Sequence, residues 1–139
     1  MGNRLILWLC LGLAMAGCTK AERNCDGKMC TMEFRTISVK LTDAAGSPVA
    51  LDDFKVVRMP GGEDVTRAYV AQEWSMFRQF GSYPVASDAD DQRFPKDSNT
   101  SLIFFGYIDG REVVTSPYVI TFDCCHIQLV SGERELVVD

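Results

Sequence analysis

Residues 118–130 read Tyr-Val-Ile-Thr-Phe-Asp-Cys-Cys-His-Ile-Gln-Leu-Val and contain two adjacent cysteines and the only histidine of the chain. The stretch is rich in β-branched and aromatic residues, and its apolar and polar residues partly alternate, which favours a strand buried mainly on one side. We therefore predict a central β-strand. Successive side chains of a strand point to opposite faces, so Cys125 should lie on one face and Cys124 and His126 on the other. A bulge or twist would be needed to bring both cysteines to one partner surface.

The composition of the whole chain indicates one domain. Its 139 residues are 47% hydrophobic, which is enough for a single core. The formal net charge of −5 arises from 14 basic and 19 acidic residues, and no basic stripe runs along the sequence. A nucleic-acid partner is therefore not expected.

Residues 1–17 predict a cleaved signal peptide. Arg4 gives a short positive start, and residues 5–16 form an almost unbroken apolar run. That run is too short to span a membrane, which takes about 20 residues. The following Ala14-Met15-Ala16-Gly17-Cys18 resembles the lipobox of bacterial lipoproteins, in which small residues precede a cysteine that is lipidated and becomes the new N-terminus. An ordinary secretory signal cut near residues 16–17 is the alternative.

The lipobox resemblance implies a lipid anchor, such as palmitate, on Cys18, and residues 18–31 would form the lipidated N-terminus and a short linker. Thr19, rather than Asp, follows Cys18, which by resemblance to lipoprotein sorting implies the outer membrane of the cell envelope. The membrane face, periplasmic or surface, stays open. The expected partners are the membrane, through the lipid, and an unknown envelope protein or glycan.

Residues 32–139 predict an all-β domain. Apolar residues alternate with polar ones from Arg35 to Thr42, which indicates a strand with one wet face. The Asp109-Gly110 pair between two apolar runs indicates a hairpin turn. Seven or so short strands argue for an antiparallel β-sandwich, transthyretin-like or immunoglobulin-like. Other expected strands are 49–59, 65–70, 81–85, 102–108, 111–114 and 136–138, with 72–80 a loop of at most one helical turn and 87–101 a polar surface loop.

Two further resemblances bear on the domain. Residues 39–49, Val-Lys-Leu-Thr-Asp-Ala-Ala-Gly-Ser-Pro-Val, resemble the opening strand and turn of carboxypeptidase-regulatory-like domains, and residues 81–83, Gly-Ser-Tyr, their later Gly-x-Tyr strand. Residues 123–126, Asp-Cys-Cys-His, together with 30–34 resemble a group of small bacterial lipoproteins without an established role. These resemblances imply a non-catalytic structural or interaction role. We therefore expect no enzyme activity and no catalytic residue.

Four cysteines remain once Cys10 leaves with the signal and Cys18 carries lipid, and they are Cys25, Cys30, Cys124 and Cys125. An even number in an exported chain indicates disulfides. A bond between the two adjacent cysteines would strain an extended strand, so both bonds should join the entry segment to the strand. Two cross-pairings remain open. Each bond would close a long loop and stabilise the fold by about 4 kcal/mol.

A metal site is the alternative use of the cysteines. Four thiolates together with His126 would offer enough ligands for zinc, provided that the thiols are reduced. Adjacent residues of a strand diverge, however, so we expect no metal or other cofactor. His126 is then predicted to be half-exposed on the polar face of its strand.

The aromatic residues Trp74, Phe77 and Tyr83 are the candidate ligand-binding residues. Together with Phe80 they could form an exposed platform for a glycan or peptide, or they could be core residues that cap one end of the sandwich. Residues 88–91, Asp-Ala-Asp-Asp, could suggest calcium, but Arg93 stands where such a loop needs glycine. A solvated acidic loop is the interpretation that we prefer.

Overall fold

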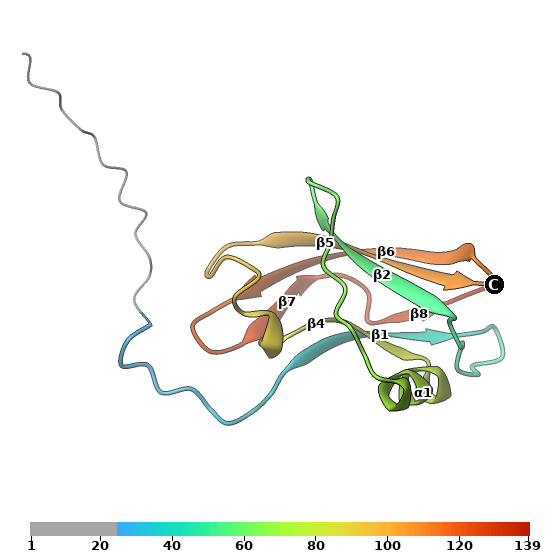
Figure 1. The fold of residues 1–139 in the computed structure, drawn as a ribbon, viewed down its shortest axis with the longest axis horizontal. Helices are drawn as coiled ribbons and strands as arrows, with labels where there is room; N and C mark the ends of the chain where they lie inside the picture. The colour runs from blue at the N-terminus through green and yellow to red at the C-terminus, as the bar shows by residue number, and fades with distance from the viewer. Residues whose placement is uncertain (1–24) are drawn as a thin grey trace, which may run out of the picture.

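A computed structural model describes residues 25–139 of the chain, and Figure 1 shows their strands in two layers with one short helix at the side. The predicted signal peptide and the lipidation site Cys18 lie outside the described residues. The elements in chain order are β1 (Thr36–Thr42), β2 (Asp53–Met59), β3 (Glu63–Asp64), α1 (Ala71–Phe80), β4 (Ser82–Ser87), the 3-10 turn η1 (Asp88–Asp90), β5 (Thr100–Ile108), β6 (Arg111–Phe122), β7 (Ile127–Ser131) and β8 (Glu135–Val137).

The strands form a three-stranded sheet and a five-stranded sheet, which confirms the predicted all-β sandwich. The first sheet has the order β4-β1-β8, with β1 antiparallel to β4 and parallel to β8. The second has the order β3-β2-β5-β6-β7, and all its neighbours are antiparallel. The described residues contain no helix that is long and apolar enough to cross a membrane.

The core lies between the two sheets. The alternation predicted for β1 is confirmed, because Ile37, Val39 and Leu41 are buried while Thr36 and Lys40 are exposed. The opposite sheet contributes alternate residues in the same way. The other largest fully buried side chains are Leu51, Phe54, Val56, Tyr83, Leu102, Phe104, Tyr118, Ile120, Phe122 and Ile127.

The predicted hairpin is present between β5 and β6. Ile108 pairs with Arg111, and the two residues between them turn the chain. Asp109 has φ of 50° and Gly110 has φ of 70°. A type I′ turn requires positive φ at both central positions, which Asp-Gly tolerates better than most pairs. This turn therefore follows directly from the sequence.

The stretch 118–130 is not one strand, contrary to the prediction. β6 ends at Phe122 and β7 begins at Ile127, with a tight turn between them. The side chain of Asp123 stabilises the turn, because its Oδ1 accepts hydrogen bonds from the backbone N–H groups of Cys125 and His126, both at 2.7 Å. Aspartate side chains accept hydrogen bonds from nearby backbone N–H groups in this way at many turns. Both cysteines therefore lie at one tip and can reach one partner segment without a bulge.

The segment predicted as a loop with at most one helical turn is the ten-residue helix α1. Its start lacks the usual polar side chain at the residue before the helix, which is Val70. Glu73 compensates by accepting a hydrogen bond from the Val70 N–H at 2.9 Å. Gly81 ends the helix in the left-handed region, with φ of 61°. Apolar residues of α1 then close the open side of the sandwich.

Two other predicted strands are displaced. The strand expected over 49–59 begins only at Asp53, and the strand expected over 65–70 is irregular backbone. Only Glu63–Asp64 pairs with β2 as the short edge strand β3. Beyond it the chain stays close to β2, since the Val65 N–H donates to the Val56 carbonyl oxygen at 2.8 Å. The expected strands at 81–85 and 136–138 correspond to β4 and β8.

Candidate functional site

The three aromatic residues predicted as ligand-binding candidates do not share an exposed platform. Tyr83 is fully buried, and its hydroxyl donates to the Val49 carbonyl oxygen at 2.8 Å and accepts from the Leu51 N–H at 2.7 Å. Burial raises the pKa of Tyr83 above its ordinary value. Trp74 and Phe77 are half-buried on α1, with ring centroids 5.2 and 6.3 Å from that of Phe54. Their arrangement is that of core residues capping one end of the sandwich.

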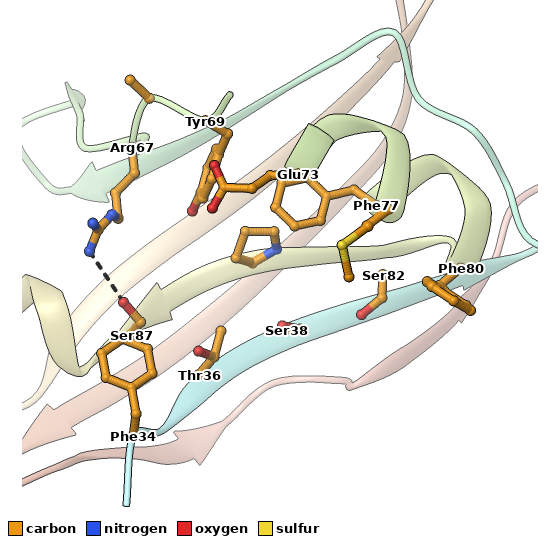
Figure 2. A pocket seen from close by; sticks show the side chains of 13 residues that line it. Phe34, Thr36, Ser38, Arg67, Tyr69, Glu73, Phe77, Phe80, Ser82 and Ser87 are labelled. Carbon is orange, nitrogen blue, oxygen red and sulfur yellow. Dashed lines mark hydrogen bonds between the residues drawn. The ribbon is translucent and has the colours of Figure 1, made fainter. Parts of the chain in front are cut away.

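A groove of about 680 Å³ lies beside these residues, between α1 and the outward face of the three-stranded sheet. Figure 2 shows α1 as one wall, strands β4 and β1 as the floor, and Phe34 and Phe80 at opposite ends. The floor is made of Thr36 and Ser38 of β1, which alternate with its buried residues, and of Ser82, Pro84 and Ser87 of β4. The lining residues are Phe34, Thr36, Ser38, Arg67, Ala68, Tyr69, Glu73, Met76, Phe77, Phe80, Ser82, Pro84 and Ser87.

Large apolar side chains are exposed around this groove. Phe34 is 65% exposed, Met76 52% and Phe80 55%, and all three line it. Clustered exposed apolar residues mark interaction sites far more often than scattered ones do. Sequence reasoning missed Phe34 and Met76, although Met76 and Phe80 are four residues apart and so share one face of the helix. That spacing becomes a signal only once residues 71–80 are recognised as helical.

The charged side chains that line the groove are Arg67 and Glu73. Arg67 lies 3.7 Å from the Asp90 carboxylate and donates a hydrogen bond to the Ser87 hydroxyl at 3.4 Å. Burial raises the pKa of Tyr69 to about 12, so its hydroxyl is neutral at physiological pH. Glu73 is exposed and forms no ion pair with a described residue. The groove is therefore mostly apolar with a weakly acidic wall.

The cysteines lie toward the opposite end of the three-stranded sheet from Phe80. Cys25 pairs with Cys124 and Cys30 with Cys125 at disulfide-bond distance, with Cα atoms 5.5 and 5.3 Å apart. This is one of the two cross-pairings that the sequence left open. With all four Sγ atoms bonded, no thiolate is left to hold zinc, and the described residues contain no cluster of three or more metal-ligating side chains.

Asp88 is not part of a solvated acidic loop, contrary to the prediction. Its side chain is only 11% exposed, and it joins the entry of β1 to the start of β7. One carboxylate oxygen accepts from the Ile127 N–H at 2.7 Å, and the other accepts from the Arg35 N–H at 2.8 Å. Burial, the largest influence, raises the pKa of Asp88, but the hydrogen bonds from Ile127, His126 and Arg35 together outweigh it and lower the pKa below its ordinary value. The carboxylate stays charged at neutral pH.

His126 is buried, with 8% of its surface exposed, and not half-exposed as predicted. Its Nδ1 lies 2.8 Å from an Asp88 carboxylate oxygen, and its Nε2 lies 2.9 Å from the Thr31 hydroxyl. A carboxylate can only accept, so neutral His126 carries its proton on Nδ1. In this neutral form Nε2 is an acceptor, and it accepts the hydroxyl proton of the exposed Thr31.

Neither a protein-family model nor a curated protein nor a solved structure matches the chain.

Proposed function

We propose that the chain is an interaction module held at a bacterial envelope by lipid on Cys18, and that it binds an apolar segment of a partner polypeptide in the groove beside α1. The resemblance of residues 14–18 to a lipobox supports the anchor. One observation carries the binding role: Phe34, Met76 and Phe80 are exposed around a single groove. Covering such side chains removes apolar surface from water, which drives most protein association.

The dimensions of the groove suit a short stretch of polypeptide. Its floor follows β4 from Ser82 to Ser87, which corresponds to about 17 Å at the usual rise of a strand. About five extended residues span that length. Hydroxyl groups of Thr36 and Ser82 line the floor, and they can hydrogen-bond the backbone of a peptide whose apolar side chains contact the walls.

A peptide fits the groove better than a glycan does. A small number of precisely placed polar groups gives a small-molecule site, such as a sugar site, its orientation and specificity. In this groove Arg67 already faces Asp90, and the side chain of Glu73 accepts the N–H that starts α1. The remaining charge of Glu73 and the net charge of −5 favour a partner segment that carries a lysine or arginine.

A random peptide library displayed on phage tests the proposal. Selected peptides should combine bulky apolar residues with a basic residue. Their affinity should fall at least about tenfold for Met76→Asp, because a carboxylate buried against apolar side chains costs more than about 1.4 kcal/mol. Gln79→Asp is the matched control, since it places the same charge near the same end of α1 outside the groove lining.

The two variants separate groove binding from a general effect of charge or stability. Loss of affinity in Met76→Asp with wild-type affinity in Gln79→Asp supports the groove. Selected peptides that bind both variants as tightly as the parent chain contradict it.

A further inference from the structure

We propose that the Thr31 hydroxyl is a nucleophile that accepts the acyl group of a carboxylic ester. His126 is its general base, and Asp88 is the residue that positions His126. This reactivity goes beyond the binding role proposed above and differs from the expectation of no enzyme activity. It rests on a continuous hydrogen-bonded chain of three side chains that lie far apart in the sequence.

The three groups have the order that activates a hydroxyl. The Thr31 hydroxyl oxygen is 2.9 Å from His126 Nε2, and His126 Nδ1 is 2.8 Å from the Asp88 carboxylate. Both distances lie within the range at which a nucleophile, its base and the group that orients the base exchange hydrogen bonds. Such a set is recognised by its geometry and not by the order of residues in the chain.

Asp88 fixes the tautomer and orientation of the imidazole. Its carboxylate accepts from the backbone N–H groups of Arg35 and Ile127 in addition to His126, so it cannot rotate without losing these bonds. The ring is therefore held with Nδ1 toward Asp88 and with the lone pair of Nε2 toward Thr31. A base that is oriented before the reaction needs no reorganisation during it.

A covalent bond positions the nucleophile. Thr31 directly follows Cys30, and His126 directly follows Cys125, and these two cysteines are bonded to each other. The disulfide thus holds Thr31 beside His126, although 95 positions separate the two residues in the chain. Thr31 itself is exposed, so a substrate can reach its hydroxyl from solvent.

A cleft lies close in sequence to Thr31 and His126, and its lining includes Arg35 and Ile127, whose N–H groups donate to Asp88; none of the three proposed residues lines it. It is about 680 Å³ in volume, and its lining begins two residues after Thr31, at Glu33, and one residue after His126, at Ile127. Arg134 also lines this cleft and forms no ion pair with a described residue. The cleft offers room for the acyl part of an ester.

The proposed reaction is acyl transfer in two balanced steps. The Thr31 oxygen attacks the ester carbonyl carbon while its proton moves to His126 Nε2, and a C–O bond to Thr31 forms. The bond to the leaving alcohol then breaks, and that alcohol takes the proton from His126. Water, deprotonated by the same nitrogen, later hydrolyses the acyl-threonine and restores the free hydroxyl.

The test uses 4-nitrophenyl acetate and the exported protein with both disulfides intact. Peptide mapping should place acetyl on Thr31 at a rate well above that on Ser101, an exposed hydroxyl of β5 that lines neither the cleft nor the groove. Thr31→Ser should still react. His126→Gln should slow acetylation of residue 31 by about 10²-fold or more, which is the usual effect of removing a general base.

Two further variants make the result independent of folding defects. Thr31→Val changes an exposed side chain and should lower nitrophenolate release to the level of spontaneous hydrolysis. The double substitution Cys30→Ser with Cys125→Ser frees residue 31 from His126 while the other disulfide remains, and it should slow acetylation as His126→Gln does. Acetylation of Thr31 no faster than that of Ser101, or equal rates in the parent chain and His126→Gln, would overturn the proposal.

Discussion

The two disulfides should stabilise the domain in a strongly non-additive way. Each bond alone closes a loop of nearly a hundred residues, because the paired cysteines are 99 and 95 positions apart. The perturbations are the double substitutions Cys25→Ser/Cys124→Ser and Cys30→Ser/Cys125→Ser, and the combination of all four. Serine is close to cysteine in size, so each variant removes the cross-link with little change in packing.

The magnitudes follow from the lengths of the loops. In the chain-entropy model a single bond across about 100 residues stabilises the fold by about 4.7 kcal/mol. Once one bond exists, the other closes only a small ring made of residues 25–30 and 124–125, for which the same relation gives about 2.5 kcal/mol. Removing either bond should therefore cost about 2.5 kcal/mol, and removing both should cost about 7 kcal/mol.

Urea unfolding measures these differences. The fluorescence of Trp74, which packs against Phe54, reports the transition, and the free energy of unfolding comes from linear extrapolation. The loss in the fourfold variant should exceed the sum of the losses in the two double variants by about 2 kcal/mol. A fourfold variant that loses no more than that sum would refute the loop-closure reasoning.

Three further predictions concern single residues. Cys18→Ala should abolish incorporation of a labelled fatty acid, and persistent labelling would place the anchor elsewhere. Asp88→Asn should cost about 1–3 kcal/mol in urea unfolding, because its amide turns a donor toward backbone N–H groups. The pKa of Asp88 is lower in the folded chain, so the ionised carboxylate adds to the free energy of unfolding. That stabilisation is complete above the unfolded pKa of about 3.9 and is lost as pH falls through the folded pKa. Acid unfolding of Asp88→Asn should lack this loss. Tyr83→Phe should cost about 1–3 kcal/mol, because the buried Leu51 N–H loses its acceptor, and an unchanged unfolding midpoint would contradict this.

The parts of the fold that sequence reasoning predicted are those set by neighbouring residues. The alternation of apolar and polar residues around Val39 predicts a strand with one buried face. The Asp109-Gly110 pair predicts a turn because both residues tolerate the positive φ angles that the turn requires. The helix α1 was missed because its start has no polar capping residue, and because Trp74 and Phe77 are stabilised by contact with Phe54 from another strand. Short helices depend more on such packing than on propensity.

The candidate sites were harder to predict because burial of polar residues depends on distant partners. The run around Asp88 looks solvated in the sequence, yet its carboxylate meets N–H groups 53 and 39 positions away. His126 was expected on a strand face, and the Asp123 turn instead directs its ring toward Asp88. The pairing of the cysteines likewise depends on how the turn presents Cys124 and Cys125, which alternation along a strand does not show.

The position of the disulfides also decides how the domain would respond to mechanical load. Tension applied to the chain ahead of Cys25 reaches the β6–β7 turn through covalent bonds at Cys124 and Cys125. It therefore does not act first on the hydrogen bonds that hold β1 between β4 and β8. β1 is therefore protected from losing its hydrogen bonds to β4 and β8 one after another. Pulling on the N-terminal side instead loads the long β6 strand of the larger sheet.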